Sequence, residues 1–295
     1  MNITRSVNRR FVQLLATVLT NQELLNFTSG RLYKGSTKNL CAPGLNCYSC
    51  PAATLSCPLG ALQAIGGTSG YGFSFYVGGF LLLLGVLWGR LACGFLCPFG
   101  FLQDLLSKLP VPKRRLFSPL RYVKYLLLVI FVLLLPVLLL MASGAGAPAF
   151  CEYICPAGTL EAAVPLLLTH AEYRQAVGGL FALKAVILAA VLIGCLFIRR
   201  FFCKMLCPLG AIYGLLNAIS ICRLHWDEKS CVSCGRCQKV CPMDIDPVAQ
   251  SHSPECIMCG QCVEACPQKA LHWGIYQQSE DNCKDGVCPW RKGGK

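Results

Sequence analysis

The feature that most restricts the fold is a series of apolar segments long enough to cross a lipid bilayer. The clearest is residues 122–142, YVKYLLLVIFVLLLPVLLLMA, and residues 71–89 and 176–198 are two more. A bilayer core about 30 Å thick takes roughly 20 apolar residues in a helix. Hydrophobic residues make up 55% of the chain and charged residues only 14%, against about 25% charged in soluble domains. We therefore predict an α-helical integral membrane protein.

The N-terminal stretch predicts a further helix that is retained in the membrane. It has a basic start and a short apolar run, RRFVQLLATVLT, but no small-residue cleavage site. Asn21, Gln22 and Glu23 end this run, so an amphipathic helix lying in the membrane interface is the alternative. With this helix the chain has about four transmembrane helices. Pro136 predicts a kink in the 122–142 segment.

The distribution of lysine and arginine predicts the orientation, because cytoplasmic loops carry more of both residues. One side holds the basic residues at 5–10, 90, 108–124 and 199–204, whereas the other holds mainly those at 31–38 and Arg174. Both termini are therefore predicted to be cytoplasmic, in the cytoplasmic (inner) membrane of a bacterium. The same pattern accounts for much of the formal net charge of +13. We predict membrane lipid, and no nucleic acid, as the partner of these charges.

Four stretches share a Cys-Pro-x-Gly-x-aliphatic signature. They are CPLGAL from Cys57, CPFGFL from Cys97, CPAGTL from Cys155 and CPLGAI from Cys207. In the predicted topology they alternate between the outer and the inner side. We therefore predict a transmembrane domain over residues 1–221, with parallel repeat halves of about 1–110 and 111–221 related by a pseudo-two-fold axis.

The most specific motif follows the last apolar segment. CVSCGRCQKVCP and CIMCGQCVEACP both read C-x2-C-x2-C-x3-C-P, the run of bacterial two-cluster ferredoxins, in which the fourth cysteine ligates the other cluster. We predict an α+β ferredoxin-like domain over residues 222–280 and a basic tail over 281–295. The predicted ligands are Cys231, Cys234, Cys237 and Cys266 for cluster 1, and Cys256, Cys259, Cys262 and Cys241 for cluster 2.

Zinc is the alternative for this domain, because four cysteines also bind zinc. Two tandem runs with this spacing and a trailing proline favour iron–sulfur clusters instead. Gly235 and Gly260 allow the close backbone approach that hydrogen bonds from amides to sulfur need. Since such clusters exchange single electrons and no substrate pocket is evident, the domain predicts electron transfer.

Two further cysteine pairs copy each other's spacing on the predicted inner side. CGFLC contains Cys93 and Cys97, and CKMLC contains Cys203 and Cys207. Two ligands from each half would complete a four-thiolate site, so we predict a third [4Fe–4S] cluster at the inner membrane face. Pro98 and Pro208 suit the first turn of a helix, and the amide-rich ends of these helices would face the negatively charged cluster.

The outer side carries six cysteines, and we predict a fourth cluster there. The uncharged loop from residue 39 to 89 is expected to fold back into the membrane. Disulfides are the alternative, because an oxidising compartment permits them. Cys41 is the weakest candidate ligand, and either Cys47 or Cys50 completes the set. The candidate ligands are Cys47, Cys50, Cys57, Cys151 and Cys155.

The remaining cysteines and the histidines predict no further cofactor. We interpret Cys195 and Cys222 as small hydrophobic residues and Cys283 and Cys288 as free cytoplasmic thiols. All four histidines lie outside the apolar segments, and no C-x-x-C-H motif occurs. We therefore expect no haem, and any electron path should run through cysteine-bound sites.

The chain resembles the NapH/NosR-type membrane polyferredoxins, the iron–sulfur quinol-dehydrogenase component of periplasmic nitrate and nitrous-oxide respiration. The resemblance covers nearly the whole chain and rests on RRFVQLL, CGFLCP, CKMLCP and the double-ferredoxin run. It implies four helices, cytoplasmic termini and electron passage to an extracytoplasmic reductase or flavoprotein. The segments NCYSCPAATLSCPLGALQ and YICPAGTLEAA look closer to uncharacterised membrane 4Fe–4S proteins of anaerobic bacteria. Their extra outer cysteines favour a cluster relay over quinol oxidation.

We therefore predict a membrane-bound electron-transfer protein that relays electrons through [4Fe–4S] clusters across the cytoplasmic membrane. Its partners would be redox proteins, a donor on the cytoplasmic side and an acceptor on the outer side. The alternative is a quinol dehydrogenase, an oxidoreductase subunit with quinone as a partner. A second alternative is a thiol-redox or assembly factor whose outer cysteines cycle as disulfides. No catalytic side chain is predicted.

Overall fold

The computed structural model describes residues 8–66, 74–144, 146–250 and 253–275. The predicted basic tail, with Cys283 and Cys288, lies outside the described residues. The first half of the chain is helical. Its elements are α1 (Arg9–Thr20), α2 (Asn26–Ser29), η1 (Ser36–Asn39), α3 (Pro58–Gly66), α4 (Ser74–Trp88), α5 (Leu91–Phe95) and α6 (Pro98–Leu106).

The second half repeats the pattern of long helices followed by short ones. Its first elements are η3 (Ser118–Tyr122), α7 (Val123–Leu127), η4 (Leu128–Leu134), α8 (Leu135–Ser143), η5 (Phe150–Ile154) and α9 (Pro156–Gly158). The rest are η6 (Thr159–Ala163), α10 (Val164–Thr169), η7 (Ala171–Ala176), α11 (Gly179–Phe197), α12 (Phe201–Met205) and α13 (Pro208–Asn217).

Two helices among the described residues are long and apolar enough to cross a membrane. They are Ser118–Ser143, with 26 residues and a mean hydropathy of 3.1, and α11, with 19 residues and a mean hydropathy of 2.6. Apolar residues of α4, Phe75–Trp88, form a shorter helix, and α1 has 12 residues. The four predicted spans therefore stay a prediction. The 26-residue helix is π-helical over η4, next to Pro136, which lacks the N–H of a regular helix.

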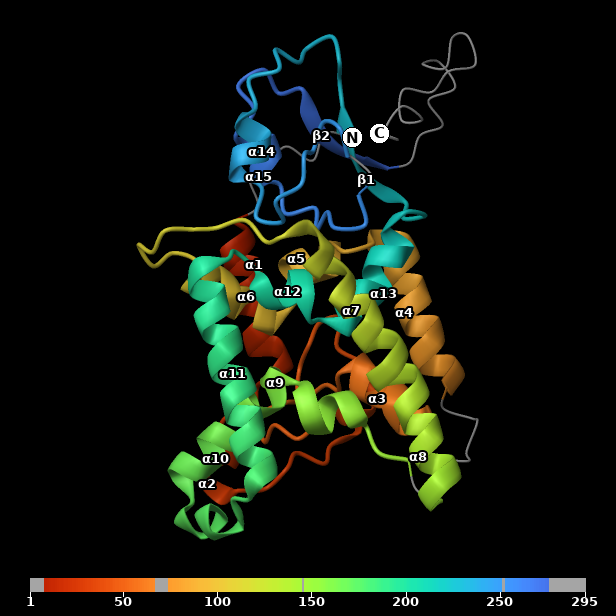
Figure 1. Ribbon diagram of the computed structural model, residues 1–295, viewed down its shortest axis with the longest axis vertical. Coiled ribbons are helices and arrows are strands. Elements are labelled where there is room, and N and C mark those ends of the chain that lie inside the picture. The colour runs from red at the N-terminus through yellow and green to blue at the C-terminus, as the bar shows by residue number, and fades with distance from the viewer. Residues whose placement is uncertain (1–7, 67–73, 145, 251–252, 276–295) are drawn as a thin grey trace.

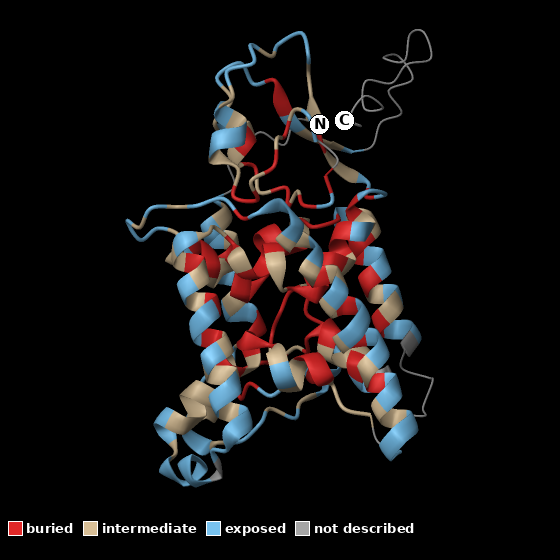
Figure 2. Ribbon diagram, in the orientation of Figure 1, coloured by how far each residue is buried: buried red, intermediate tan, exposed pale blue. Residues whose placement is uncertain are grey.

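The short helices that carry the cysteine motifs lie inside a frame of longer helices (Figure 1). Buried residues concentrate between the helices, whereas their outward faces are exposed (Figure 2). The outward faces are apolar: Leu133 of η4 and Val186 and Ile193 of α11 are all exposed. The core that they surround contains cysteines packed against Phe99, Leu209 and other apolar side chains.

The C-terminal segment forms a small α+β unit at one end of this frame (Figure 1). Strands β1 (Cys222–Trp226) and β2 (Leu271–Ile275) pair antiparallel, with Leu224 opposite Trp273. Two short helices, α14 (Arg236–Val240) and α15 (Gln261–Glu264), lie between them in sequence. Leu224, Cys262 and Leu271 form its buried cluster, so this unit has a small apolar core of its own.

Candidate metal centres

The C-terminal unit gathers its eight motif cysteines around two cavities. The structure places the fourth cysteine of each run with the first three of the other, which is the grouping expected of two-cluster ferredoxins. One cavity, of about 290 Å³, is lined by Cys231, Cys234, Cys237 and Cys266, and the other, of about 20 Å³, by Cys241, Cys256, Cys259 and Cys262.

The two cysteine runs of the C-terminal unit have the same backbone conformation, with positive φ angles at equivalent positions. Ser233 and Met258, at equivalent positions, have φ angles of 51° and 48°, and the following glycines, Gly235 and Gly260, have 68° and 79°. A Cβ on Gly260 would also come within 2.7 Å of the Trp273 ring. Glycine is therefore needed at this position for both backbone conformation and space.

Bound metal would change the ionisation of these thiols. Burial raises the pKa of Cys256 to about 12, so this thiol is neutral at pH 7 when no metal is bound. Thiolates are the ligands that iron takes, and the charge of a bound metal removes the proton. The chemistry of this donor set therefore fits an iron–sulfur cluster.

The structure brings the four cysteines of the predicted inner site together; we call them the inner set. All are buried, with 7–8% exposed, and both Cys97 and Cys207 interact electrostatically with Cys203 and Cys93. Cys97 and Cys207 are the N-caps of α6 and α13, with proline in the first turn as predicted. Their sulfurs accept hydrogen bonds from the amides of Gly100 at 3.4 Å and Gly210 at 3.3 Å.

Two buried arginines tie the halves of the inner set together in a crossed arrangement. Arg90 and Arg200 each precede the first cysteine of their own motif by three residues, and both are fully buried. Arg90 Nη2 donates to the carbonyl of Cys203 at 3.4 Å, and Arg200 Nη1 donates to that of Cys93 at 2.9 Å. Arg90 Nε is buried without a hydrogen-bond partner among the described residues. This free donor and the two cations fit a negatively charged cluster between the halves.

Each arginine is held by one carboxylate. Arg200 pairs with Asp104 of α6, at 2.6 Å from its Nη2 and 2.9 Å from its Nε. Arg90 pairs with Glu255 of the C-terminal unit at 2.9 Å, and Lys124 shares the same carboxylate. Although burial opposes ionisation, Arg90 and Lys124 hold the pKa of Glu255 below its usual value. Glu255, the residue before Cys256, therefore links the C-terminal unit to Arg90 beside the inner set.

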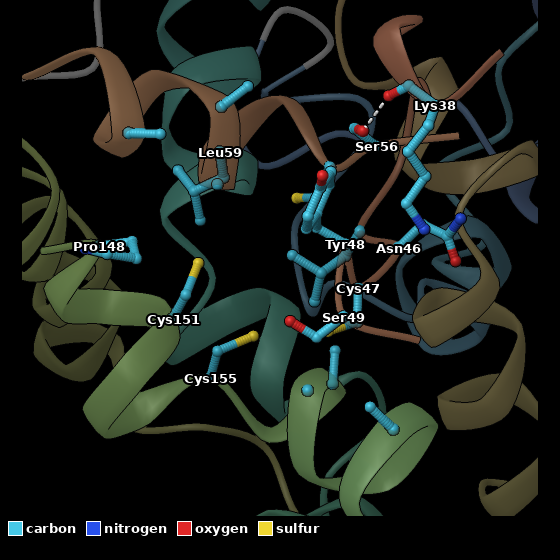
Figure 3. A pocket seen from close by; sticks show the side chains of 18 of the residues that line it. Lys38, Asn46, Cys47, Tyr48, Ser49, Ser56, Leu59, Pro148, Cys151 and Cys155 are labelled. Carbon is cyan, nitrogen blue, oxygen red and sulfur yellow. Dashed lines mark hydrogen bonds between the residues drawn. The ribbon is translucent and has the colours of Figure 1, made fainter. Parts of the chain in front are cut away.

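The outer cysteines surround a cavity of about 670 Å³. In Figure 3, Cys151 and Cys155 extend from helical segments towards the open space that Cys47 and Tyr48 border from the other side. Cys57 also lines this cavity. Cys151 and Cys155 both interact electrostatically with Cys57. The outer set is Cys47, Cys57, Cys151 and Cys155.

The other two outer cysteines differ in position. Cys41 lines the cavity, next to Cys57. Cys50 does not line it and packs instead with Ala52, Ala53 and Ala162. The geometry thus favours Cys47 over Cys50, the two alternatives that spacing left open. Every described cysteine is a free thiol.

The inner set and the outer set are each a group of four cysteines and not a site for a single metal ion. Among residues 8–66, 74–144, 146–250 and 253–275, no three His, Cys, Asp or Glu side chains are placed to hold one metal ion. A [4Fe–4S] cluster has a different requirement, because it takes four separate cysteine thiolates. Four cysteines spread around a space, as in the outer cavity, fit this requirement.

Four residues at the same position of the Cys-Pro motif were not among the predicted site residues. The sixth residue after each Cys-Pro cysteine is polar, and this repeat is the signal that identifies them. In the first half, glutamines contact cysteine sulfurs. In the second half, Glu161 accepts a hydrogen bond from the Cys47 amide at 2.8 Å, and Tyr213 donates to the Pro43 carbonyl at 3.2 Å. The four residues are Gln63, Gln103, Glu161 and Tyr213.

The comparisons with known proteins agree with this chemistry. Residues 71–116, 126–166 and 180–226 match the family described as 4Fe-4S binding domain, and residues 223–267 match the 4Fe-4S dicluster domain. The chain is 28% identical to the ferredoxin-type protein NapH of Haemophilus influenzae over 167 residues, 55% of this chain and 50% of NapH. It is 33% identical to the regulatory protein NosR of Pseudomonas aeruginosa over 171 residues, 55% of this chain and 21% of NosR.

The chain belongs to the NapH/NosR-type polyferredoxins. It is also 32% identical to the putative electron transport protein YccM of Escherichia coli over 172 residues, 56% of this chain and 44% of YccM. It is an iron–sulfur protein that binds [4Fe–4S] clusters. The chain spans less than two thirds of the length of the curated relatives that it matches first. No solved structure matches it.

Proposed function

We propose that this polyferredoxin relays electrons across the cytoplasmic membrane through four cysteine-bound [4Fe–4S] sites, between a cytoplasmic donor and an extracytoplasmic acceptor. Its membrane domain would be residues 1–221 with four helices, and its ferredoxin-like domain residues 222–280. Two apolar helices and the apolar outward faces support this location. The ligands would be the two ferredoxin-like sets, the inner set and the outer set.

The observation that carries the proposal is an unbroken series of contacts from the ferredoxin-like unit to the outer set. At its first step, a Cβ on Gly94 would lie 2.5 Å from the carbonyl oxygen of Ile257. Gly94 follows the inner-set Cys93, and Ile257 follows Cys256 of cluster 2. The Phe95 and Trp273 rings meet edge to face beside this contact, with centroids 5.9 Å apart. Cluster 2 is therefore the one that faces the inner set.

The second step joins the inner set to the outer one. A Cβ on Gly44 would lie 2.6 Å from the Cα of Cys97, and the amide of Leu45 donates to the Cys97 sulfur. The outer loop thus reaches the inner set inside the frame of helices. Clusters at the two faces of a core about 30 Å thick would be far apart, and this re-entrant loop shortens the gap between them.

The amides, arginines and apolar side chains around the sites each stabilise the bound clusters in a different way. The amides at the ends of α6 and α13 donate to inner-set sulfurs, and the crossed arginines balance the charge of the cluster. The apolar core around the sites excludes water. The clusters supply the one-electron chemistry, and the protein orders them from cluster 1 through cluster 2 and the inner set to the outer set.

The deciding experiment replaces Cys93 and Cys203 with serine and counts iron in the purified, anaerobic protein. We expect the double variant to lose about four iron atoms per chain, the content of one cubane. Cys222→Ser is the matched control, because Cys222 lies in β1 outside all four sets. Unchanged iron in the double variant would refute the inner site and with it the relay.

A second measurement tests whether electrons cross the membrane through the protein. The protein is placed in vesicles that enclose ferricyanide, a membrane-impermeant oxidant, and dithionite is added outside. The wild type should reduce the enclosed ferricyanide, whereas the Cys93→Ser/Cys203→Ser variant should not. Reduction of the clusters by menaquinol alone would instead favour the quinol dehydrogenase alternative.

A further inference from the structure

Two buried glutamines occupy equivalent places in the two cysteine sites of the membrane segment. Gln63 of α3 is the sixth residue after Cys57, and Gln103 of α6 is the sixth after Cys97. Their exposed fractions are 0% and 1%. A glutamine buried this deeply needs hydrogen-bond partners, because a buried amide without them has lost its hydrogen bonds to water.

Each glutamine reaches the first cysteine of the motif in the other half of the chain. Gln63 Nε2 lies 3.2 Å from the sulfur of Cys151, and Gln103 Nε2 lies 3.1 Å from the sulfur of Cys203. The residues in each pair are 88 and 100 positions apart. One side-chain amide therefore spans the two halves at the outer set, and a second does the same at the inner set.

The hydrogen-bond partners fix the orientation of the Gln63 amide. Its Oε1 accepts from the backbone N–H of Phe150 at 2.8 Å, and a backbone N–H can only donate. Its Nε2 donates to the carbonyl of Leu59 at 3.2 Å, one turn earlier in α3. The nitrogen is therefore the atom that faces the Cys151 sulfur.

Gln103 is fixed in the same way. Its Nε2 donates to the carbonyl of Phe99, one turn earlier in α6, at 3.3 Å. Its Oε1 accepts from the Cys195 thiol at 3.7 Å, so Cys195 is more than an apolar filler. A carbonyl can only accept, so the nitrogen of Gln103 faces the sulfur of Cys203.

We propose that Gln63 and Gln103 are positioning residues that set the reduction potentials of the outer and inner clusters independently, each through one N–H···S hydrogen bond across the repeat. This inference rests on the proposed function, since it takes Cys151 and Cys203 as cluster ligands. Hydrogen bonds to cluster sulfurs favour the more negative, reduced state and so raise the potential. The two sites thus use the same device, and each can be altered without the other.

The test uses the full-length protein in detergent without oxygen, in four variants: Gln63→Leu, Gln63→Glu, Gln103→Leu and Gln103→Glu. Leucine removes the donor, and glutamate keeps the shape and the acceptor but cannot donate when ionised. Midpoint potentials are measured by redox titration with EPR detection. The inner and outer signals are first assigned by their loss in Cys93→Ser and Cys151→Ser, respectively.

Each glutamine should affect only its own cluster. We expect a tenfold shift of the reduction equilibrium towards the oxidised form, which is about 59 mV for a one-electron couple. Gln103 variants should lower the inner potential alone and Gln63 variants the outer one alone, so each serves as the control for the other.

Three outcomes would overturn the inference. They are unchanged potentials in variants that keep their iron, equal shifts of both clusters, and loss of the cluster in both variants of one glutamine, which would make its role structural. The proposed function fails separately, if the wild type shows no signals that Cys93→Ser and Cys151→Ser remove.

Discussion

The backbone of Gly44 lies so close to Cys97 that a Cβ on residue 44 would come within 2.6 Å of the Cys97 Cα. Gly44 belongs to the loop of the outer set, whereas Cys97 belongs to the inner set. Tyr213 supports this contact from α13, where it is buried and bonds to the carbonyl of Pro43. Residues 43–45 are thus the part of the chain that joins the two sites.

Gly44→Ala should therefore disturb the step between the inner and outer clusters. The added methyl group meets backbone, which cannot rotate away, and overpacking of this kind costs about 1–3 kcal/mol. We expect slower reduction of ferricyanide inside vesicles with little loss of iron from the ferredoxin-like sets. Gly78→Ala is the control, because a Cβ there has nothing within 4 Å. A wild-type rate for Gly44→Ala would contradict the role of residues 43–45 in joining the inner and outer sets.

Gly94→Ala should interrupt the earlier step, between cluster 2 and the inner set. Its Cβ would lie 2.5 Å from the carbonyl oxygen of Ile257, so the loop that holds Cys256 must move away. We expect faster hydrogen exchange in residues 253–257 and a slower rate of inner-cluster reduction by dithionite. Gly79→Ala, with open space around its Cβ, should leave both unchanged. Equal exchange in the two variants would show that the contact is unimportant.

Motif spacing predicted the local cysteine neighbours, such as Cys93 with Cys97 and Cys203 with Cys207, because C-x3-C and C-x2-C patterns restrict the backbone. The repeat of the same motif in the two halves then predicted that these two pairs meet at the inner set. The first turns of α6 and α13 followed from Pro98 and Pro208 for the same reason. Local rules of this kind do not require knowledge of the rest of the fold.

Contacts between distant residues could not be predicted in this way. Arg90 and Arg200 belong to the positive charges of one membrane side, yet both are fully buried. Burying an arginine has a large desolvation cost unless an opposite charge pairs with it, and its partners Glu255 and Asp104 lie 165 and 96 residues away in sequence. Lys38, a basic residue on the opposite side, is also buried and bonds to the Ala53 carbonyl at 2.6 Å.

The outer set leads to a prediction that separates two neighbouring cysteines. Cys47→Ser should remove about four iron atoms per chain, because a cubane needs four thiolates and Cys47 lines the cavity. Cys50→Ser should leave the iron content unchanged, since Cys50 does not line the cavity and packs against alanines instead. Iron and sulfide analysis of both variants provides the measurement. The reverse pattern would exchange the roles of the two residues.

Glu255→Gln should loosen the ferredoxin-like unit from the membrane segment. The carboxylate pairs with two cations, Arg90 and Lys124, whose side chains are fully buried. Removing one partner of a buried ion pair lowers the stability by about 3–5 kcal/mol, because the opposite charge stays buried without a partner. We expect faster hydrogen exchange over residues 253–257 in the variant at pH 7. Glu264→Gln, at an exposed position of α15, is the matched control and should behave as the wild type does.

The pH dependence of this contact follows from the lowered pKa of Glu255. Burial alone would raise that pKa, but Arg90 and Lys124 hold it below the ordinary 4.5. A carboxyl group with a depressed pKa in the folded state stabilises the fold above its unfolded pKa and loses this effect as the pH falls through the folded value. Wild-type exchange over residues 253–257, corrected for the intrinsic rate, should therefore rise only below about pH 4.5, whereas Glu255→Gln should show no such step. A step at the same pH in both proteins would assign the effect to another group.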